Sequence, residues 1–307
     1  MKIKKKINYN ILYATLAWIG GFIILFSIWS IISACKKGTS FTLPSIFQSF
    51  YGFGKIVAGK SMVGIPKAEA FVGKEWVAIG ISIGQALFCF LISGLLALIL
   101  AILTYYVRFF QYLFWPFITI TRAIPTAVIM CFATIFIFQK TVWLLPIIVS
   151  FFIIFPILYE AFNNAILNIS KFKIQMGKVY QVSRWNQFRK IVLPSCAPYM
   201  LSACVAGFGL TIKTIWASQV LSFLLVGNSW NPNYQSVGKI IATLISYLNN
   251  NNVLTHWNVK PPSHVDACSI IVGWAIMAVL ISLIVEVGLK YLAKLISPYS
   301  RKRRFNT

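Results

Sequence analysis

The chain has 307 residues, of which 59% are hydrophobic and only 11% are charged, and its mean hydropathy is +0.79. Repeated apolar runs longer than about 18 residues leave no polar stretch for a separate soluble core, so composition excludes a multidomain soluble protein and predicts one polytopic membrane domain. The net charge of +23 comes from basic residues at the ends of these runs, as in contacts with anionic lipid, so nucleic-acid binding is not expected.

Six apolar segments are each long enough to cross roughly 30 Å of hydrocarbon, and they predict six transmembrane helices. The segments are 11–34, 77–104, 116–138, 142–164, 195–226 and 267–289. Backbone groups in lipid must be paired internally, and the runs do not alternate as barrel strands do, so the predicted fold class is all-α. We expect an N-terminal transmembrane helix in 1–40, an extracellular amphipathic segment in 41–76 and the main transmembrane domain in 77–300.

Basic residues predict the orientation of these helices. They are concentrated before the first span, between residues 171 and 190, and at 301–304. With six spans these regions share one side, which the positive-inside rule makes the cytoplasm, so both termini are expected there. The first apolar run also resembles a lipoprotein signal ending at Cys35. That run is longer than a signal core and five more follow, so an uncleaved span is favoured.

Residues 54–61 fit the nucleotide-binding pattern GxxxxGK[ST], from Gly54 to Ser61. A functional loop of this kind needs a buried strand before it, a helix after it and an acid that holds magnesium. The chain has only five acids, and the predicted orientation puts this segment outside the cell. We therefore interpret the match as coincidental.

No metal or cofactor site is predicted. The six cysteines lie in or beside apolar runs without CxxC spacing, which is typical of small buried hydrophobic residues. The two histidines, His256 and His264, share one polar loop but have no neighbouring Cys or Glu.

Residues 171–194 interrupt the apolar pattern with a short amphipathic stretch. Ser183 is a plausible N-cap, so we expect a helix, a break and a second helix, with Pro194 at the start of the fifth span. The residues alone fit an anchor in lipid headgroups or a protein-docking surface equally well. The apolar positions recur at three- and four-residue steps, as on one helix face: Met176, Val179, Tyr180, Trp185, Phe188, Ile191 and Val192.

The same stretch resembles the cytoplasmic EAA loop of ABC importer permeases. Ile191, Leu193 and Pro194 match the end of that pattern, and Ser183, Arg184 and Trp185 match its small-basic-aromatic step. The first half departs from the family: Gln175, Met176 and Gly177 replace Glu-Ala-Ala, and Gln181 stands at the usual glycine. Gly177 is expected to supply part of the missing flexibility.

The resemblance continues in order along the chain. Leu43-Pro44-Ser45 is similar to the outer segment after the first span, 121–126 to the entry of the third span, 143–162 to the fourth, and 236–241 to the segment before the last. The ordered set is most similar to permeases of nitrate, sulfonate and taurine importers.

This resemblance implies a type I ABC importer permease and no enzyme activity. The expected partners are separate ATPase subunits, an extracellular solute-binding (lipo)protein, a second permease copy and membrane lipid. Residues 171–194 would form the coupling helix in a groove of the ATPase. The implied ATPase-coupling residues are Gln175, Gly177, Gln181, Ser183, Arg184, Trp185, Phe188, Ile191, Leu193 and Pro194.

Three ionisable residues fall inside the predicted spans, where charge is costly and usually faces a cavity or a partner. Arg122 and Glu160 lie near the cytoplasmic ends of adjacent spans, so we expect either an ion pair or, for Arg122, a place on the translocation path. Lys213 is deeper and could line the path for an anion. Gln219 is also expected on the translocation path; relatives often carry Glu at this position, so the glutamine removes one partner for Lys213.

Other functions stay open. A secondary transporter would show repeated halves and several membrane acids, and a membrane enzyme would need an acid or histidine cluster; neither pattern is evident. Within the permease class, the substrate is expected to be a small anionic or polar solute. Another class, such as a phosphonate or a vitamin precursor, is the alternative.

Overall fold

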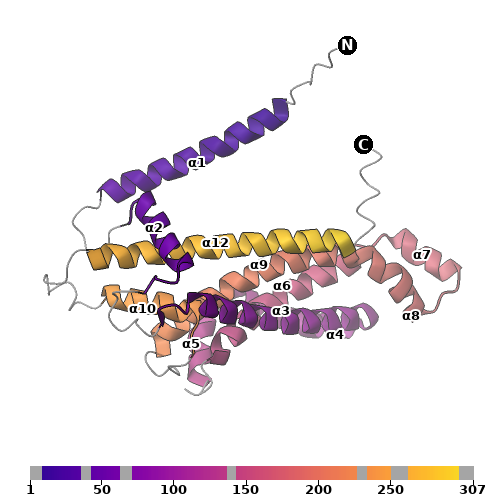
Figure 1. Cartoon of the computed structure of the whole chain (residues 1–307). Coiled ribbons are helices and arrows are strands. Elements are labelled where there is room, and N and C mark those ends of the chain that lie inside the picture. The colour runs from indigo at the N-terminus through magenta and orange to yellow at the C-terminus, as the bar shows by residue number, and fades with distance from the viewer. Residues whose placement is uncertain are drawn as a thin grey trace, which may run out of the picture. The chain divides into compact units, whose positions relative to one another are not determined.

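The computed structural model describes residues 9–35, 43–62, 71–136, 143–226, 234–249 and 262–296. The described residues contain helices and no strand, which confirms the predicted all-α fold. Lys2, His256 and the basic residues at 301–304 lie outside the described residues. The elements, shown in Figure 1, are α1 (Tyr9–Cys35), α2 (Ile46–Val57), α3 (Glu75–Tyr106), α4 (Arg108–Ala123), α5 (Thr126–Phe136), α6 (Leu145–Leu167), α7 (Lys171–Val179), α8 (Arg184–Gln187), a π-helical turn (Phe188–Val192), α9 (Leu193–Val226), α10 (Val237–Asn249) and α12 (Pro262–Ile296).

Five helical stretches are long and apolar enough to cross a membrane, and they agree with five of the six predicted spans. They are Leu16–Ala34, Glu75–Tyr106, Leu145–Leu167, Arg184–Leu225 and Ala267–Tyr291. The predicted third span is different, because it is divided between α4 and α5 with a bend of 102°. Counted as one broken span, the pair brings the total in the described residues to six.

Pro125 explains this bend. Its ring disfavours helical geometry in the preceding residue, and Ile124 is accordingly extended, with φ −75° and ψ 127°. The amide of Ile124 still bonds to the carbonyl of Ile120 and closes α4, whereas Val128 and Ile129 donate to the Pro125 carbonyl and open α5. The apolar span predicted over 116–138 is therefore present in its described part, but it is divided into two helices at Ile124 and Pro125.

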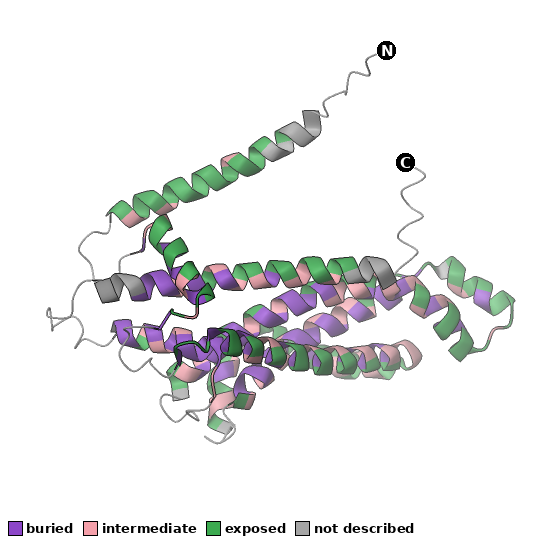
Figure 2. Ribbon diagram, in the orientation of Figure 1, coloured by how far each residue is buried: buried purple, intermediate pink, exposed green. Residues whose placement is uncertain are grey.

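The chain divides into two compact units, residues 1–73 with 244–277 and residues 74–243 with 278–307. In the larger unit α3, α6 and α9 pack side by side (Figure 1). Burial is most extensive along α6 (Figure 2), where Ile154 and Leu158 belong to one core with Met200 of α9. This core supports the end from which α7 and α8 project.

In the smaller unit, α2 begins with a capping box and packs closely on the first part of α12. The Ser45 side chain accepts the Gln48 amide, and the Gln48 side chain accepts the Ser45 amide. A Cβ at Gly52 would lie 2.2 Å from the Ser269 carbonyl oxygen, so only glycine permits this approach.

The nucleotide-binding pattern at residues 54–61 does not have the secondary structure that this function requires. Gly54 is inside α2, which ends at Val57, and Gly59 occupies a left-handed turn with φ 68°. A phosphate-binding loop follows a strand and opens a helix, whereas this segment follows a helix. The structure supports the interpretation that the match is coincidental.

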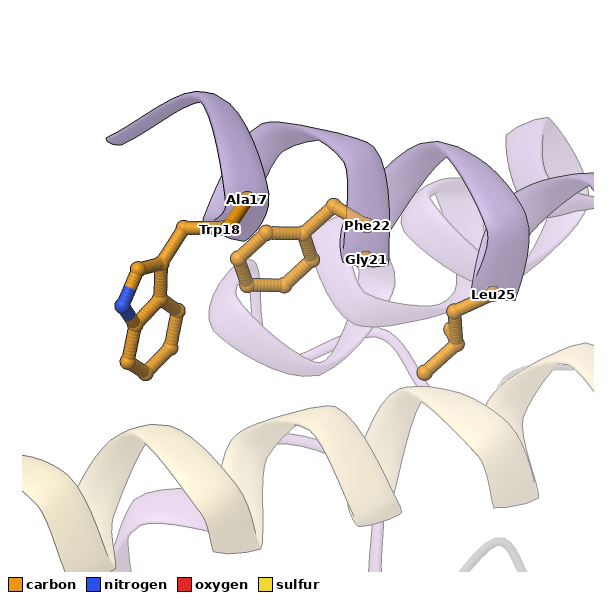
Figure 3. Close-up of a pocket in the computed structure, with 5 residues that line it drawn as sticks. All are labelled: Ala17, Trp18, Gly21, Phe22 and Leu25. Carbon is orange, nitrogen blue, oxygen red and sulfur yellow. The ribbon is translucent and has the colours of Figure 1, made fainter. Parts of the chain in front are cut away.

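Helix α1 is exposed and apolar over its described length. Three of its aromatic rings make successive contacts, with centroids 6.5 Å apart for Trp18 and Phe22 and 6.4 Å apart for Phe22 and Phe26. Figure 3 shows Trp18 and Phe22 projecting from the same side of α1, beside Gly21, where they line an apolar pocket. A helix apolar all round suits a lipid environment.

Candidate functional site

The 171–194 segment forms two short helices joined by a tight turn. α7 ends at Val179, and α8 begins at Arg184 and runs through the π-helical turn into α9. The predicted order of helix, break and helix is confirmed, and Pro194 is the second residue of α9. Ser183 occupies the predicted N-cap position but its side chain makes no capping bond; its carbonyl instead accepts the Gln187 amide at 2.8 Å.

The turn after α7 is a Schellman motif. The Val182 amide donates to the Gly177 carbonyl at 3.0 Å, and the Gln181 amide donates to the Lys178 carbonyl at 3.0 Å. Gln181 therefore takes the left-handed position, with φ 50°, where glycine is most common. This is the position at which the EAA pattern has its glycine, so the bend forms here without that residue.

Gly177 has a packing role in place of the flexibility expected of it. A Cβ on Gly177 would lie 2.9 Å from Nε2 of Gln187, whose side chain is buried and donates to the Ile174 carbonyl at 2.7 Å. The missing side chain lets α8 pack against α7. The geometry of the whole segment therefore depends on a hydrogen bond that crosses between its two helices.

The apolar residues of this segment divide into an exposed and a buried group, so the single apolar face predicted for them is wrong in its second half. Val179, Tyr180 and Trp185 are 79%, 74% and 60% exposed, whereas Phe188 and Val192 are 3% and 0% exposed. Figure 2 shows the exposed surface of α7 and α8. The exposed apolar stripe consists of Phe172, Met176, Val179, Tyr180 and Trp185.

The remaining predicted coupling residues differ in their exposure. Gln175, Arg184 and Pro194 are exposed, and Ile191 and Leu193 are half-buried. Four basic side chains are also exposed: Lys178, Arg184, Arg189 and Lys190. An apolar stripe with a basic border is a surface suited to a protein partner.

Phe188 attaches the segment to α3 through aromatic contacts. Its ring centroid lies 5.3 Å from that of Tyr105 and 5.8 Å from that of Tyr106, the last two residues of α3. Trp185 also stacks on the Phe188 ring, with centroids 6.3 Å apart. The exposed Trp185 is thus one ring contact away from the transmembrane core.

Arg122 and Glu160 form the ion pair expected from their positions. The Arg122 guanidinium donates to the Glu160 carboxylate, and this contact joins α4 to α6. The two side chains are 49% and 44% exposed. This ion pair explains how the charge of Arg122 is accommodated. A place for Arg122 on the translocation path stays a prediction.

Lys213 is exposed on α9 and has an acidic neighbour that the sequence did not suggest. Glu286 of α12 lies within electrostatic range of Lys213 and forms an ion pair with Lys290 at 2.6 Å. Because α12 is remote in sequence, spacing could not have revealed this.

Gln219 lies in a buried polar cluster rather than on an exposed face of α9. Its Nε2 donates to Oε1 of Gln85 at 2.6 Å, and its own Oε1 accepts the Ser82 hydroxyl at 3.0 Å and the Gly238 amide at 3.2 Å. The Tyr234 hydroxyl also donates to Gln85, at 2.9 Å. Every amide atom of Gln219 thus serves the packing of α3, α9 and the start of α10.

Burial in this cluster keeps Tyr234 protonated and fixes the identity of residue 238. Burial raises the pKa of Tyr234 to about 12, against the lowering effect of its hydrogen bonds. A Cβ on Gly238 would lie 2.1 Å from the Cβ of Gln219, so no larger residue fits. Sequence reasoning missed the hydrogen bonds that Ser82 and Gln85 make with Gln219 and Tyr234, because polar residues separated by more than a hundred positions carry no pairing signal.

The described residues contain no group of three His, Cys, Asp or Glu that could hold a metal ion. The side chain of His264 lies outside the described residues, although its backbone belongs to α12. The geometry of the chain thus offers an interaction surface and polar contacts between helices.

Fold and site together define an α-helical polytopic membrane protein that projects an apolar, basic-bordered helix pair from one end of its transmembrane core. Residues 93–298, more than half of the chain, match the family described as binding-protein-dependent transport system inner membrane component, and the chain belongs to this family. It is thus an ABC-type permease, a transport component rather than an enzyme, of systems that include an ATPase and a binding protein. No curated protein matches the sequence at a significant level.

Proposed function

We propose that this permease couples to its ATPase through the exposed apolar stripe of the 171–194 segment. The observation that carries the proposal is the exposure of Trp185 and Tyr180 on the two short helices of the 171–194 segment, in a chain of this transport family. Large aromatic residues contribute most of the binding energy at interfaces when they become buried, and the basic border would orient the partner. The stripe would lie in a groove of the ATPase.

The structure supports a route by which movement of this contact reaches the spans. Trp185 stacks on Phe188, and Phe188 packs on Tyr105 and Tyr106 at the end of α3. The segment also continues through the π-helical turn into α9 without a loop. Closure of the ATPase subunits would therefore displace α3 and α9 together.

The remaining architecture follows the importer class. Two copies of the chain form the path, a solute-binding protein docks outside, and both termini lie in the cytoplasm. The substrate is a small anionic or polar solute, of the sulfonate, nitrate or taurine kind. Lys213 supports an anion, because its exposed side chain lies within a span where a charge normally faces a cavity or a partner.

The coupling proposal is tested by co-expression and co-purification with a candidate ATPase subunit. Trp185→Asp places a charge at the centre of the stripe and should lower assembly at least thirtyfold, the size of an interface hot spot of about 2 kcal/mol. Phe47→Asp is the control, since Phe47 of α2 is an aromatic residue on another element that is even more exposed, at 89%, than Trp185. Unchanged assembly of Trp185→Asp would reject the proposal.

Phe188→Ala separates binding of the ATPase from the movement that this binding passes to the transmembrane helices. Because Phe188 is buried within its own chain, its removal should leave the ATPase contact of Trp185 available but weaken the link between ATP hydrolysis and uptake. The measurement is the ratio of uptake to ATP hydrolysis in reconstituted vesicles. An unchanged ratio would exclude the aromatic route through Tyr105 and Tyr106.

A further inference from the structure

A second polar feature lies at the base of the 171–194 segment, where α6, α7 and α9 meet. A cavity of about 490 Å³ opens there, within the range of small-molecule sites. Its polar lining comes from all three helices and from the turn after α6: Asn164, Asn168, Ser170, Lys173, Ser195 and Tyr199. None of these residues belongs to the exposed apolar stripe.

The chemistry of the lining favours an anion. Nζ of Lys173 donates to Oγ of Ser195 at 3.2 Å, which holds the ammonium group beside the α9 wall and leaves it two further hydrogens to donate. No acidic residue lines the cavity. The nearest acid along α6, Glu160, is occupied by Arg122.

The position of the cavity favours an anion with an apolar tail. The apolar part of α6 that could cross a membrane ends at Leu167, so the cavity lies where the span gives way to the polar segment. Ala161, Ala165 and Ile169 form an apolar wall beside the polar lining. Tyr199 is 65% exposed at the same level, as tyrosines are at membrane interfaces.

We propose that this cavity binds the phosphate headgroup of an anionic membrane phospholipid. Lys173 and Ser195 would hold the phosphate, the amides of Asn164 and Asn168 would donate to the glycerol headgroup, and the acyl chains would lie along the apolar wall. Basic pockets between transmembrane helices are suited to such headgroups. The proposal requires only that the chain lies in a membrane and is independent of the coupling proposal.

The test measures lipid binding to the purified full chain in neutral detergent, by native mass spectrometry during titration with phosphatidylglycerol or phosphatidylcholine. Phosphatidylglycerol should bind preferentially. Lys173→Ala should weaken its binding about fivefold, the contribution of one basic residue at an anionic membrane surface, and Lys173→Arg should restore most of it. Phosphatidylcholine binding should not change.

Lys178→Ala is the matched control, because Lys178 is an exposed lysine of the same helix that does not line the cavity. It should bind phosphatidylglycerol as the unmodified chain does. Equal losses in the two alanine variants would show diffuse surface attraction and overturn the site, as would no loss in Lys173→Ala. Glycerol phosphate that competes as strongly as the lipid would identify a soluble phosphate ester as ligand and overturn the lipid assignment.

Discussion

Replacing Gln181 with glycine should stabilise the turn between α7 and α8. Gln181 has φ 50° in the Schellman motif, a left-handed conformation that costs an L-residue about 1–2 kcal/mol. Glycine removes this cost, but its greater freedom in the opened chain offsets about 0.5–1 kcal/mol. The net gain in the free energy of local opening should therefore be about 0.5–1 kcal/mol.

Hydrogen exchange of the purified protein measures this local opening. Peptides that contain Val182, whose amide closes the motif, should exchange about two- to fivefold more slowly in Gln181→Gly. Gln181→Ala keeps a Cβ and should show little gain, and Gln181→Val should exchange faster because branched residues avoid positive φ. Equal slowing in the alanine and glycine variants would show that the glutamine side chain, rather than the backbone angle, limits the turn.

Four further outcomes follow from the contacts of the larger unit. Gly238→Ala should lower the unfolding temperature, since its Cβ would lie 2.1 Å from that of Gln219, whereas Gly80→Ala, with open space, should not. Gln219→Leu should lower the free energy of unfolding by about 1–3 kcal/mol for each buried donor that it leaves without an acceptor. In a double-mutant cycle in detergent, Gln219→Leu combined with Gln85→Leu should lower it by less than the sum of the two single changes. Charge reversal at Arg122 or Glu160 alone should lower stability, and reversal of both should recover it. The pKa of Tyr234 is raised to about 12, so its contribution to stability is fully present below pH 10 and is lost as pH rises toward 12. Unfolding measured over a pH series should show this loss of stability in the unmodified chain but not in Tyr234→Phe.

Hydropathy predicted five of the spans correctly because lipid imposes the same length and polarity on any helix that crosses it. The bend before Pro125 was missed, since an apolar run has the same composition when straight or broken. The pairing of Arg122 with Glu160 was predictable, because both charges fall near the same end of neighbouring spans.

The 171–194 segment shows the limit of sequence reasoning more clearly. Periodicity placed Trp185 and Phe188 on one apolar face, but it carries no information on what covers each residue. Tyr105 and Tyr106 help to bury Phe188, whereas Trp185 stays 60% exposed, and this difference depends on the end of α3, some eighty residues away. The cluster around Gln219 was inaccessible for the same reason.

The break at Ile124 and Pro125 also limits where lipid can surround this protein. A helix end leaves its last carbonyls or first amides without intrahelical partners; at this corner the amides of Val128 and Ile129 bond to the Pro125 carbonyl, and hydrocarbon offers no partner to the remaining groups. At membrane depth this corner must therefore lie against water or against polypeptide. The corner therefore marks a part of the protein surface that lipid acyl chains cannot cover.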